Sequence, residues 1–220
     1  MIADLIFFNT IDKLIKLQVS EWKLHYDMLS KAGNKYVSID EFALGHGKVM
    51  SVICKRFFDG SKKINFNQYC CYMMLVAAHG DCHGVNEKRI QDAYDDYCAI
   101  RKPQPNGLIK SSDFAEKNPE FLTNYQIEAI LGPMSKALSC DFYPGEINYL
   151  QFKEIVESIL AFSLMDRNHD STLSRKEIKI FLKLMGKHNR SEDEVRKFFD
   201  SHDVNDDGEV SLYEFLSTKY

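Results

Sequence analysis

A short signature recurs along the 220-residue chain and constrains its fold more than any other feature. It consists of an apolar residue, a residue suited to begin a helix, two variable positions, an acid or amide, and a large apolar residue. Five copies are clear and the one at 109–114 is weaker; the clear ones are 37–42, 64–69, 147–152, 173–178 and 210–215. The repeat therefore predicts that a helix begins at each copy along the chain.

The residues of the signature predict how each helix begins and continues. Ser or Asn at the start and Glu or Gln three residues later predict a capping box. Apolar residues at helical spacing follow, for example Ile155, Ile159 and Phe162. A helix stop is expected at Asn118–Pro119. Strand-like alternation never extends beyond a few residues, so we predict an all-α protein.

Two loops before the last two copies carry oxygen-bearing side chains at alternate positions. The first loop is 166–177 and the second loop is 203–214. Calcium takes roughly six to eight oxygen ligands, which such a loop supplies from positions 1, 3 and 5, a carbonyl at 7, a water held at 9 and a bidentate Glu at 12. We expect two calcium ions per chain. The predicted ligands are Asp166, Asn168, Asp170, Thr172, Ser174 and Glu177 in the first loop, and Asp203, Asn205, Asp207, Glu209, Ser211 and Glu214 in the second.

Both loops match the twelve-residue pattern of the EF-hand superfamily, and the chain resembles that family. The resemblance implies a compact array of helix-loop-helix units whose paired loops are joined by short antiparallel bridges. In the last pair, Leu173 and Val210 are the expected bridge partners. A Glu at position 12 also favours calcium over magnesium, since it supplies two oxygens at once.

The earlier copies lack the carboxylates that a divalent ion needs, so we expect them to be degenerate, structural hands. We divide the chain into a degenerate EF-hand-like region, 1–85, and an EF-hand region, 86–220, that holds a degenerate pair (about 86–152) and a calcium-binding pair (about 153–220). The residues at the former ligand positions are Ser30, Ala32 and Asn34; a shortened loop over 59–68; Lys102, Gln104 and Asn106; and Cys140, Phe142 and Pro144.

The spacing of the later copies predicts a shared helix. Ile147 and Leu173 are 26 residues apart, which leaves room for one helix that ends one hand and begins the next. This arrangement resembles the penta-EF-hand branch and favours a compact body over two tethered lobes. A degenerate front with two intact hands at the back is also similar to the layout of grainins, EF-hand proteins of amoebic granules. That similarity implies a granule location and a part in calcium storage or in calcium-dependent granule behaviour.

Composition excludes several classes of function. The chain has 28 Lys and Arg against 32 Asp and Glu, a net charge of −4, and no polybasic block, so no nucleic acid or anionic lipid surface is expected as a partner. Apolar runs are too short to span a membrane. The N-terminus lacks a signal-peptide pattern, and the six cysteines read as reduced thiols. We expect a cytoplasmic protein, with an intracellular granule or vesicle as the alternative.

The sequence gives little support for a zinc site or for enzyme activity. His79, Cys82 and His83 are spaced like zinc ligands, but a fourth ligand is missing, so a turn is the better interpretation. Phosphate-binding loops, nucleophile elbows and metalloprotease helices are absent from the sequence, and we do not expect an enzyme.

The expected function is calcium binding without catalysis, as a buffer or store. The alternative is a sensor that exposes an apolar groove to a target protein or helix when calcium binds. Met165 and Met185 flank the calcium-binding pair and are candidates to line such a groove, although Met at helical spacing also suits a core.

Overall fold

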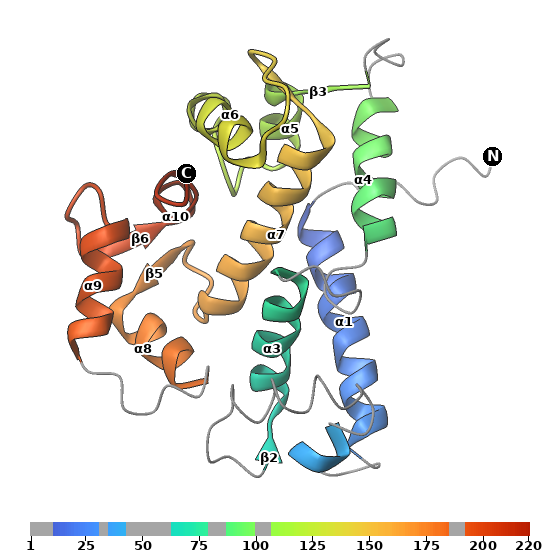
Figure 1. Ribbon diagram of the computed structural model, residues 1–220, viewed down its shortest axis with the longest axis vertical. Helices are drawn as coiled ribbons and strands as arrows, with labels where there is room; N and C mark the ends of the chain where they lie inside the picture. Colours follow the sequence, from blue (N-terminus) through green and yellow to red (C-terminus); the bar gives the residue numbers. More distant parts are fainter. Residues whose placement is uncertain (1–10, 31–34, 43–62, 79–86, 100–106, 185–191) are drawn as a thin grey trace.

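The computed structural model describes residues 11–30, 35–42, 63–78, 87–99, 107–184 and 192–220, and these are mostly helical (Figure 1). The expected all-α class with short antiparallel bridges is confirmed. The helices are α1 (Ile11–Leu29), α3 (Phe66–Ala78), α4 (Glu87–Ala99), α5 (Ser111–Lys117), α6 (Asn124–Leu138), α7 (Tyr149–Met165), α8 (Arg175–Leu184), α9 (Glu192–His202) and α10 (Leu212–Ser217). The strands are β1 (Val37–Ser38), β2 (Lys63–Ile64), β3 (Ile109–Lys110), β4 (Glu146–Ile147), β5 (Thr172–Ser174) and β6 (Glu209–Ser211).

All five clear copies of the signature form the predicted capping box. In each copy, the side chain of the Ser or Asn that caps the helix accepts the backbone N–H of the residue three positions later. The acid or amide at that later position accepts the backbone N–H of the capping residue. The weaker copy has Lys110 at the N-cap of α5 and forms no side-chain cap. That helix ends at Asn118, as expected.

The strands form three separate antiparallel pairs. The apolar residue of one copy lies opposite that of another: Val37 with Ile64, Ile109 with Ile147, and Leu173 with Val210. All six side chains are buried, which explains why this position is apolar in every copy. The bridge between Leu173 and Val210 is therefore confirmed, and the first two copies pair in the same way although their loops are the most altered.

Helix α7 is the shared helix that the spacing predicts. It runs through the middle of the molecule and packs against α3, α4, α6, α8 and α10 (Figure 1). Ile155, Ile159, Phe162 and Met165 are buried along its length. Because it is enclosed by these helices, α7 holds the hand at 140–151 and the hand at 166–177 in one body and does not act as an exposed tether.

A buried asparagine connects the first described helix to the middle of the chain. Asn118 is fully buried, and its Oδ1 accepts the backbone N–H of Ile11 (3.0 Å) at the start of α1. Its Nδ2 donates to the Tyr97 hydroxyl (2.6 Å) and to the Phe114 carbonyl (2.8 Å). The residue that ends α5 thus also caps α1, a contact that no local pattern indicates.

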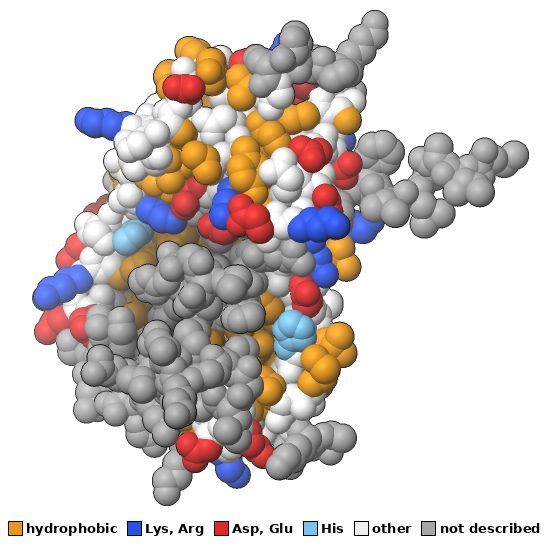
Figure 2. Space-filling view, turned by 45° about the vertical axis from the view of Figure 1, so that its right-hand side comes forward, with side chains coloured by type: hydrophobic (Ala, Val, Ile, Leu, Met, Phe, Trp, Pro, Cys, Tyr) orange, Lys and Arg blue, Asp and Glu red, His pale blue; other side chains and the backbone are white. Residues whose placement is uncertain are grey.

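The surface carries charges of both signs. On the face shown in Figure 2, acidic and basic side chains lie side by side across the middle of the molecule. Within the described residues, every helix is too short or too polar to cross a membrane. Cys70, Cys71, Cys98 and Cys140 are free thiols, and burial raises the pKa of both Cys70 and Cys71 to about 12.

Candidate metal centre

Asp166 organises the start of the first loop. Its Oδ1 accepts the backbone N–H of His169 (2.7 Å) and its Oδ2 accepts that of Ser171 (3.0 Å). The side-chain oxygen of Asn168 accepts the N–H of Asp170 (3.3 Å). These bonds wind positions 1, 3 and 5 into one tight turn.

The second loop repeats this arrangement. Asp203 accepts the backbone N–H groups of Asp207 (3.1 Å) and Gly208 (2.9 Å). Asn205 also accepts the N–H of Asp207 (3.0 Å), and Asp207 accepts that of Glu209 (2.9 Å). The two loops differ at one bond: Oδ1 of position 1 accepts from position 4 in the first loop and from position 5 in the second, while the bonds from positions 5 and 6 to positions 3 and 1 are shared.

The glutamate at position 12 closes each loop. Glu177 Oε1 accepts the N–H groups of Arg167 (2.8 Å) and Asn168 (3.3 Å), and its Oε2 accepts both the N–H (3.0 Å) and the hydroxyl (2.7 Å) of Ser174. The corresponding donors to Glu214 are Val204, Asn205 and Ser211. A residue at the start of the exiting helix is thus held against the start of its own loop.

Three of the predicted ligand carboxylates are buried without a cation. Asp166, Glu177 and Glu214 are 6%, 5% and 4% exposed. Within the described residues, each accepts hydrogen bonds from neutral groups, and none forms an ion pair with Lys, Arg or His. Removing a carboxylate from water costs several kcal/mol by order of magnitude, and the hydrogen bonds of each loop offset this cost. A bound cation would balance the negative charges that these hydrogen bonds leave in place.

The hydrogen bonds of the first loop favour the ionised form of its acids. Burial raises the pKa of Glu177, but hydrogen bonds from Ser174, Arg167 and Asn168 together lower it below the usual glutamate value. The N–H of Thr172 lowers the pKa of the exposed Asp170. Both side chains are therefore carboxylates at neutral pH, the form that binds a cation.

Positions 4 and 6 of each loop have left-handed backbone. The φ angles are 59° at His169 and 71° at Ser171 in the first loop, and 58° at Asp206 and 86° at Gly208 in the second. Glycine adopts this conformation freely, whereas Ser171 pays roughly 1 kcal/mol for it. Two degenerate loops keep glycine with positive φ at position 6, namely Gly107 and Gly145.

The loop at 140–151, which we predict to be degenerate, is closed by the side chain at its position 12. In the loop at 140–151, Gln151 occupies position 12 and is fully buried. Its Oε1 accepts the N–H of Asn148 (2.9 Å), while its Nε2 donates to the Leu131 carbonyl (3.2 Å) and the Ser135 hydroxyl (2.7 Å) of α6. This amide ties the two helices of the hand together, so the loop is closed by hydrogen bonds.

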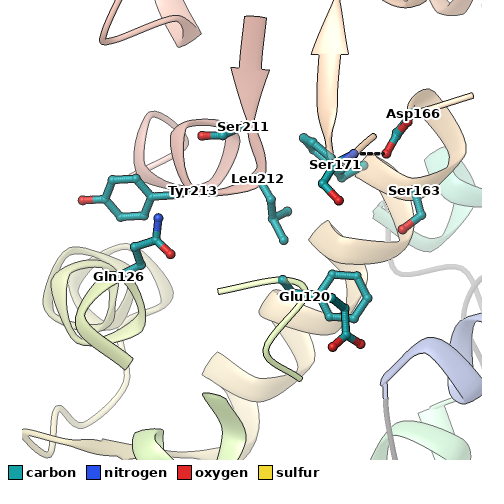
Figure 3. Close-up of a pocket in the computed structure, with 10 residues that line it drawn as sticks. Glu120, Gln126, Ser163, Asp166, Ser171, Ser211, Leu212 and Tyr213 are labelled. Carbon is teal, nitrogen blue, oxygen red and sulfur yellow. Dashed lines mark hydrogen bonds between the residues drawn. The ribbon is translucent and has the colours of Figure 1, made fainter. Parts of the chain in front are cut away.

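Two pockets adjoin the first loop and share Asp166, Ser171, Ser163, Phe121 and Glu120. The smaller, about 100 Å³, lies between the first loop and the start of α10 (Figure 3). The larger, about 680 Å³, lies between the first loop and α1, and its apolar lining is Ile15, Val19, Phe121 and Leu164. The predicted ion site therefore borders an apolar groove.

In each loop, positions 1, 3 and 5 lie in one turn, positions 7 and 9 lie in β5 or β6, and position 12 lies in the first turn of the next helix. The side chains of Ser174 and Ser211 also serve their capping boxes. Within the described residues, no three His, Cys, Asp or Glu side chains form a metal-binding group. Several predictions lie outside the described residues: those on His79, Cys82 and His83, on Ala32 and Asn34, on 59–62, on Lys102, Gln104 and Asn106, and on Met185. The boundary between 85 and 86 also lies outside the described residues, and the division into regions stays a prediction.

Sequence reasoning did not identify Gln151 as the residue that joins two helices. The sequence predicts its place in a capping box, where Oε1 accepts a hydrogen bond. The hydrogen bonds that its Nε2 donates to α6 depend on the tertiary fold. The signal in the sequence is that position 12 holds an amide in place of an acid.

One family model and several solved structures are similar to this chain. The family model of an EF-hand domain pair matches residues 157–217, which contain both loops. Calcium-loaded apo-aequorin from Aequorea victoria is 13% identical, with 92% of this chain and 88% of that chain covered and a TM-score of 0.32. EFHA2 in a calcium-binding state is 14% identical, with 94% and 70% covered and a TM-score of 0.29. At such low scores, the match to the domain pair is the comparison that bears on the site.

Proposed function

We propose that this chain is a non-catalytic calcium-binding protein that acts as a calcium buffer or store, with one ion in each of the two loops. The observation that carries the proposal is the burial of Asp166, Glu177 and Glu214 with neutral partners. The match of residues 157–217 to an EF-hand domain pair supports the choice of ion. The reduced thiols suit a cytoplasmic location, which we propose with a granule as the alternative.

The donor set suits calcium. Each loop offers three carboxylates, one amide oxygen and a backbone carbonyl, all hard oxygen ligands. The ion would supply two positive charges among these groups. Both carboxylate oxygens of Glu177 and of Glu214 would bind the ion. Oε1 of each would exchange its backbone N–H donors for the ion, and Oε2 of each would also keep its hydrogen bonds to the helix cap. Binding can therefore proceed without loss of the helices that follow.

Calorimetric titration of the full chain with calcium tests the proposal. We expect a stoichiometry of two ions per chain, because the remaining loops lack the carboxylates that balance a divalent charge. Magnesium at the same concentration serves as the control and should bind more weakly, since bidentate Glu suits the larger ion. A stoichiometry of three or four calcium ions would show that a loop predicted to be degenerate binds calcium. If calcium released no heat and did not compete with magnesium, the proposal would be refuted.

We expect the second loop to bind calcium more tightly than the first. The second loop adds Asp206 and Glu209, whereas Arg167, Arg175 and Lys176 lie in the first, a difference of five unit charges. A unit charge about 8 Å from a divalent ion contributes ~0.4 kcal/mol after screening at physiological salt. The total is about 2 kcal/mol, more than about tenfold in affinity. The left-handed backbone at position 6 also lowers the calcium affinity of the first loop relative to the second, because Ser171 adopts it at a cost and Gly208 adopts it freely.

Single variants measure this difference without cooperativity between the loops. The Glu177→Gln chain should keep a site near the tighter affinity, and the Glu214→Gln chain should keep only a weak one. The opposite order would mean that packing of the flanking helices outweighs loop charge and turn geometry.

A sensor role is the second candidate, and the groove beside Asp166 favours it. Its apolar lining residues lie next to an ion ligand, so a change in the first loop would alter the groove. Met165 is only 4% exposed and belongs to the core. For a sensor, fluorescence of a hydrophobic dye should rise when calcium is added. Unchanged dye fluorescence at calcium saturation would favour the buffer.

A further inference from the structure

A third pocket, about 270 Å³ in volume, opens on the first loop beside its predicted ligands. Asn168, Ser174 and Glu177 contribute positions 3, 9 and 12, and position 9 is where the EF-hand pattern holds calcium through a water. The remaining polar residues of the lining are both cations, Arg167 and Lys176. Ligand positions and positive charges thus face the same space.

Neither cation has an evident role in the fold. Both side chains are exposed, and within the described residues neither forms an ion pair. Lys176 lies in the first turn of α8, where the helix dipole disfavours positive charge. Both charges also oppose a cation in the loop. The second loop has Val204 and Tyr213 at the equivalent positions, so the loop pattern itself does not require cations.

We propose that this pocket binds a phosphoryl group that contacts Arg167 and Lys176 and replaces the water ligand of calcium near Ser174. The inference rests on the calcium site proposed above. A phosphate monoester has three terminal oxygens, enough for the guanidinium, the ammonium and the metal ion at once, and arginine suits phosphate geometry. A phosphate monoester also carries a charge of about −1.5 to −2 at neutral pH against −1 for a carboxylate, which favours the phosphoryl group beside two cations and a metal ion.

Calcium should control this binding. Without the ion, the carboxylate of Glu177 lines the same pocket and repels an anion. With the ion bound, the local charge becomes positive. Because the coupling is reciprocal, the phosphoryl group should raise the calcium affinity of the first loop by the same factor by which calcium raises phosphate affinity. The gap in affinity between the two loops should then narrow.

Phenyl phosphate is a suitable soluble probe, titrated by calorimetry into the full chain with saturating calcium or with chelator. We expect binding only with calcium. The variant with both Arg167→Gln and Lys176→Gln should bind the probe at least about tenfold more weakly, because two charge-assisted contacts are lost. Without the probe, the same variant should bind calcium in the first loop about threefold more tightly, since two repelling charges are gone. These opposite changes distinguish a binding pocket from a structural role.

The matched control carries Arg196→Gln and Lys197→Gln on α9, which removes the same two charges outside the pocket and should leave probe affinity unchanged. Equal probe binding by the pocket variant and the original chain, or binding in chelator, would overturn the inference. If calcium binds but the probe does not, the inference fails and the proposed function stands. If calcium alone does not bind, the proposed function fails as well.

Vesicles identify the source of the phosphoryl group. Cosedimentation in calcium with vesicles that contain phosphatidylinositol phosphate, and not with phosphatidylcholine alone, would assign the site to a lipid headgroup. Binding of phenyl phosphate without cosedimentation would assign it to a soluble phosphate ester.

Discussion

A chain that carries both Glu177→Gln and Glu214→Gln should show no calcium binding at micromolar concentrations. Each change removes one negative charge and leaves a single oxygen where calcium requires two. The helices should remain intact, because Gln68 and Gln151 occupy the same position in other copies and still accept the N–H of the N-cap residue. Calorimetry measures the binding, and circular dichroism checks the helix content.

Glu41→Gln is the matched control. It makes the same substitution in the same type of capping box, where Ser38 is the N-cap, but in a copy without ligand carboxylates. Calcium binding should be unchanged in this variant. If the double variant still bound calcium at micromolar concentrations, the ligands would have to lie outside the two loops.

The local features of this fold follow from short stretches of sequence. A capping box needs only residues three apart, so all five could be predicted from the signature. The length of α7 follows from the spacing between Ile147 and Leu173, and the bridge between Leu173 and Val210 follows from the paired loops. The predicted ligand sets of both loops are also local, and in each loop hydrogen bonds join position 12 to the backbone at positions 2 and 3.

The contacts that join distant segments could not be predicted. Asn118 looked like an ordinary helix stop, but it also caps α1, 107 residues earlier. In the same way, Gln151 resembled a simple cap, and its contacts with α6 require the tertiary fold. The pairing of Val37 with Ile64 was equally hidden, because the apolar positions persist after the ligands are lost. The buried apolar pair, the strand pairing and the Tyr26 hydroxyl, which bonds to the carbonyls of Lys35 and Ile64, join the two segments.

Gln151→Glu should destabilise the protein strongly although the two side chains have the same shape. Its Nε2 donates to Leu131 and Ser135 in a fully buried site, and a carboxylate there has no hydrogen to donate. A buried charge that loses its partners costs about 3 kcal/mol or more. For a chain of this length, such a loss lowers Tm by roughly 10 °C. Thermal unfolding followed by circular dichroism measures the shift.

The control for this prediction is Gln126→Glu, the same substitution at the same capping-box position of α6. Gln126 is less buried and uses its Oε1 to accept from Thr123, so an acid there should leave Tm unchanged or slightly higher, as acids favour helix N-termini. Equal stability of the two variants would mean that the Nε2 contacts of Gln151 contribute little. Calcium should not rescue Gln151→Glu, because positions 1, 3 and 5 of that loop are Cys140, Phe142 and Pro144. One restored glutamate cannot rebuild a site whose other oxygen ligands are gone.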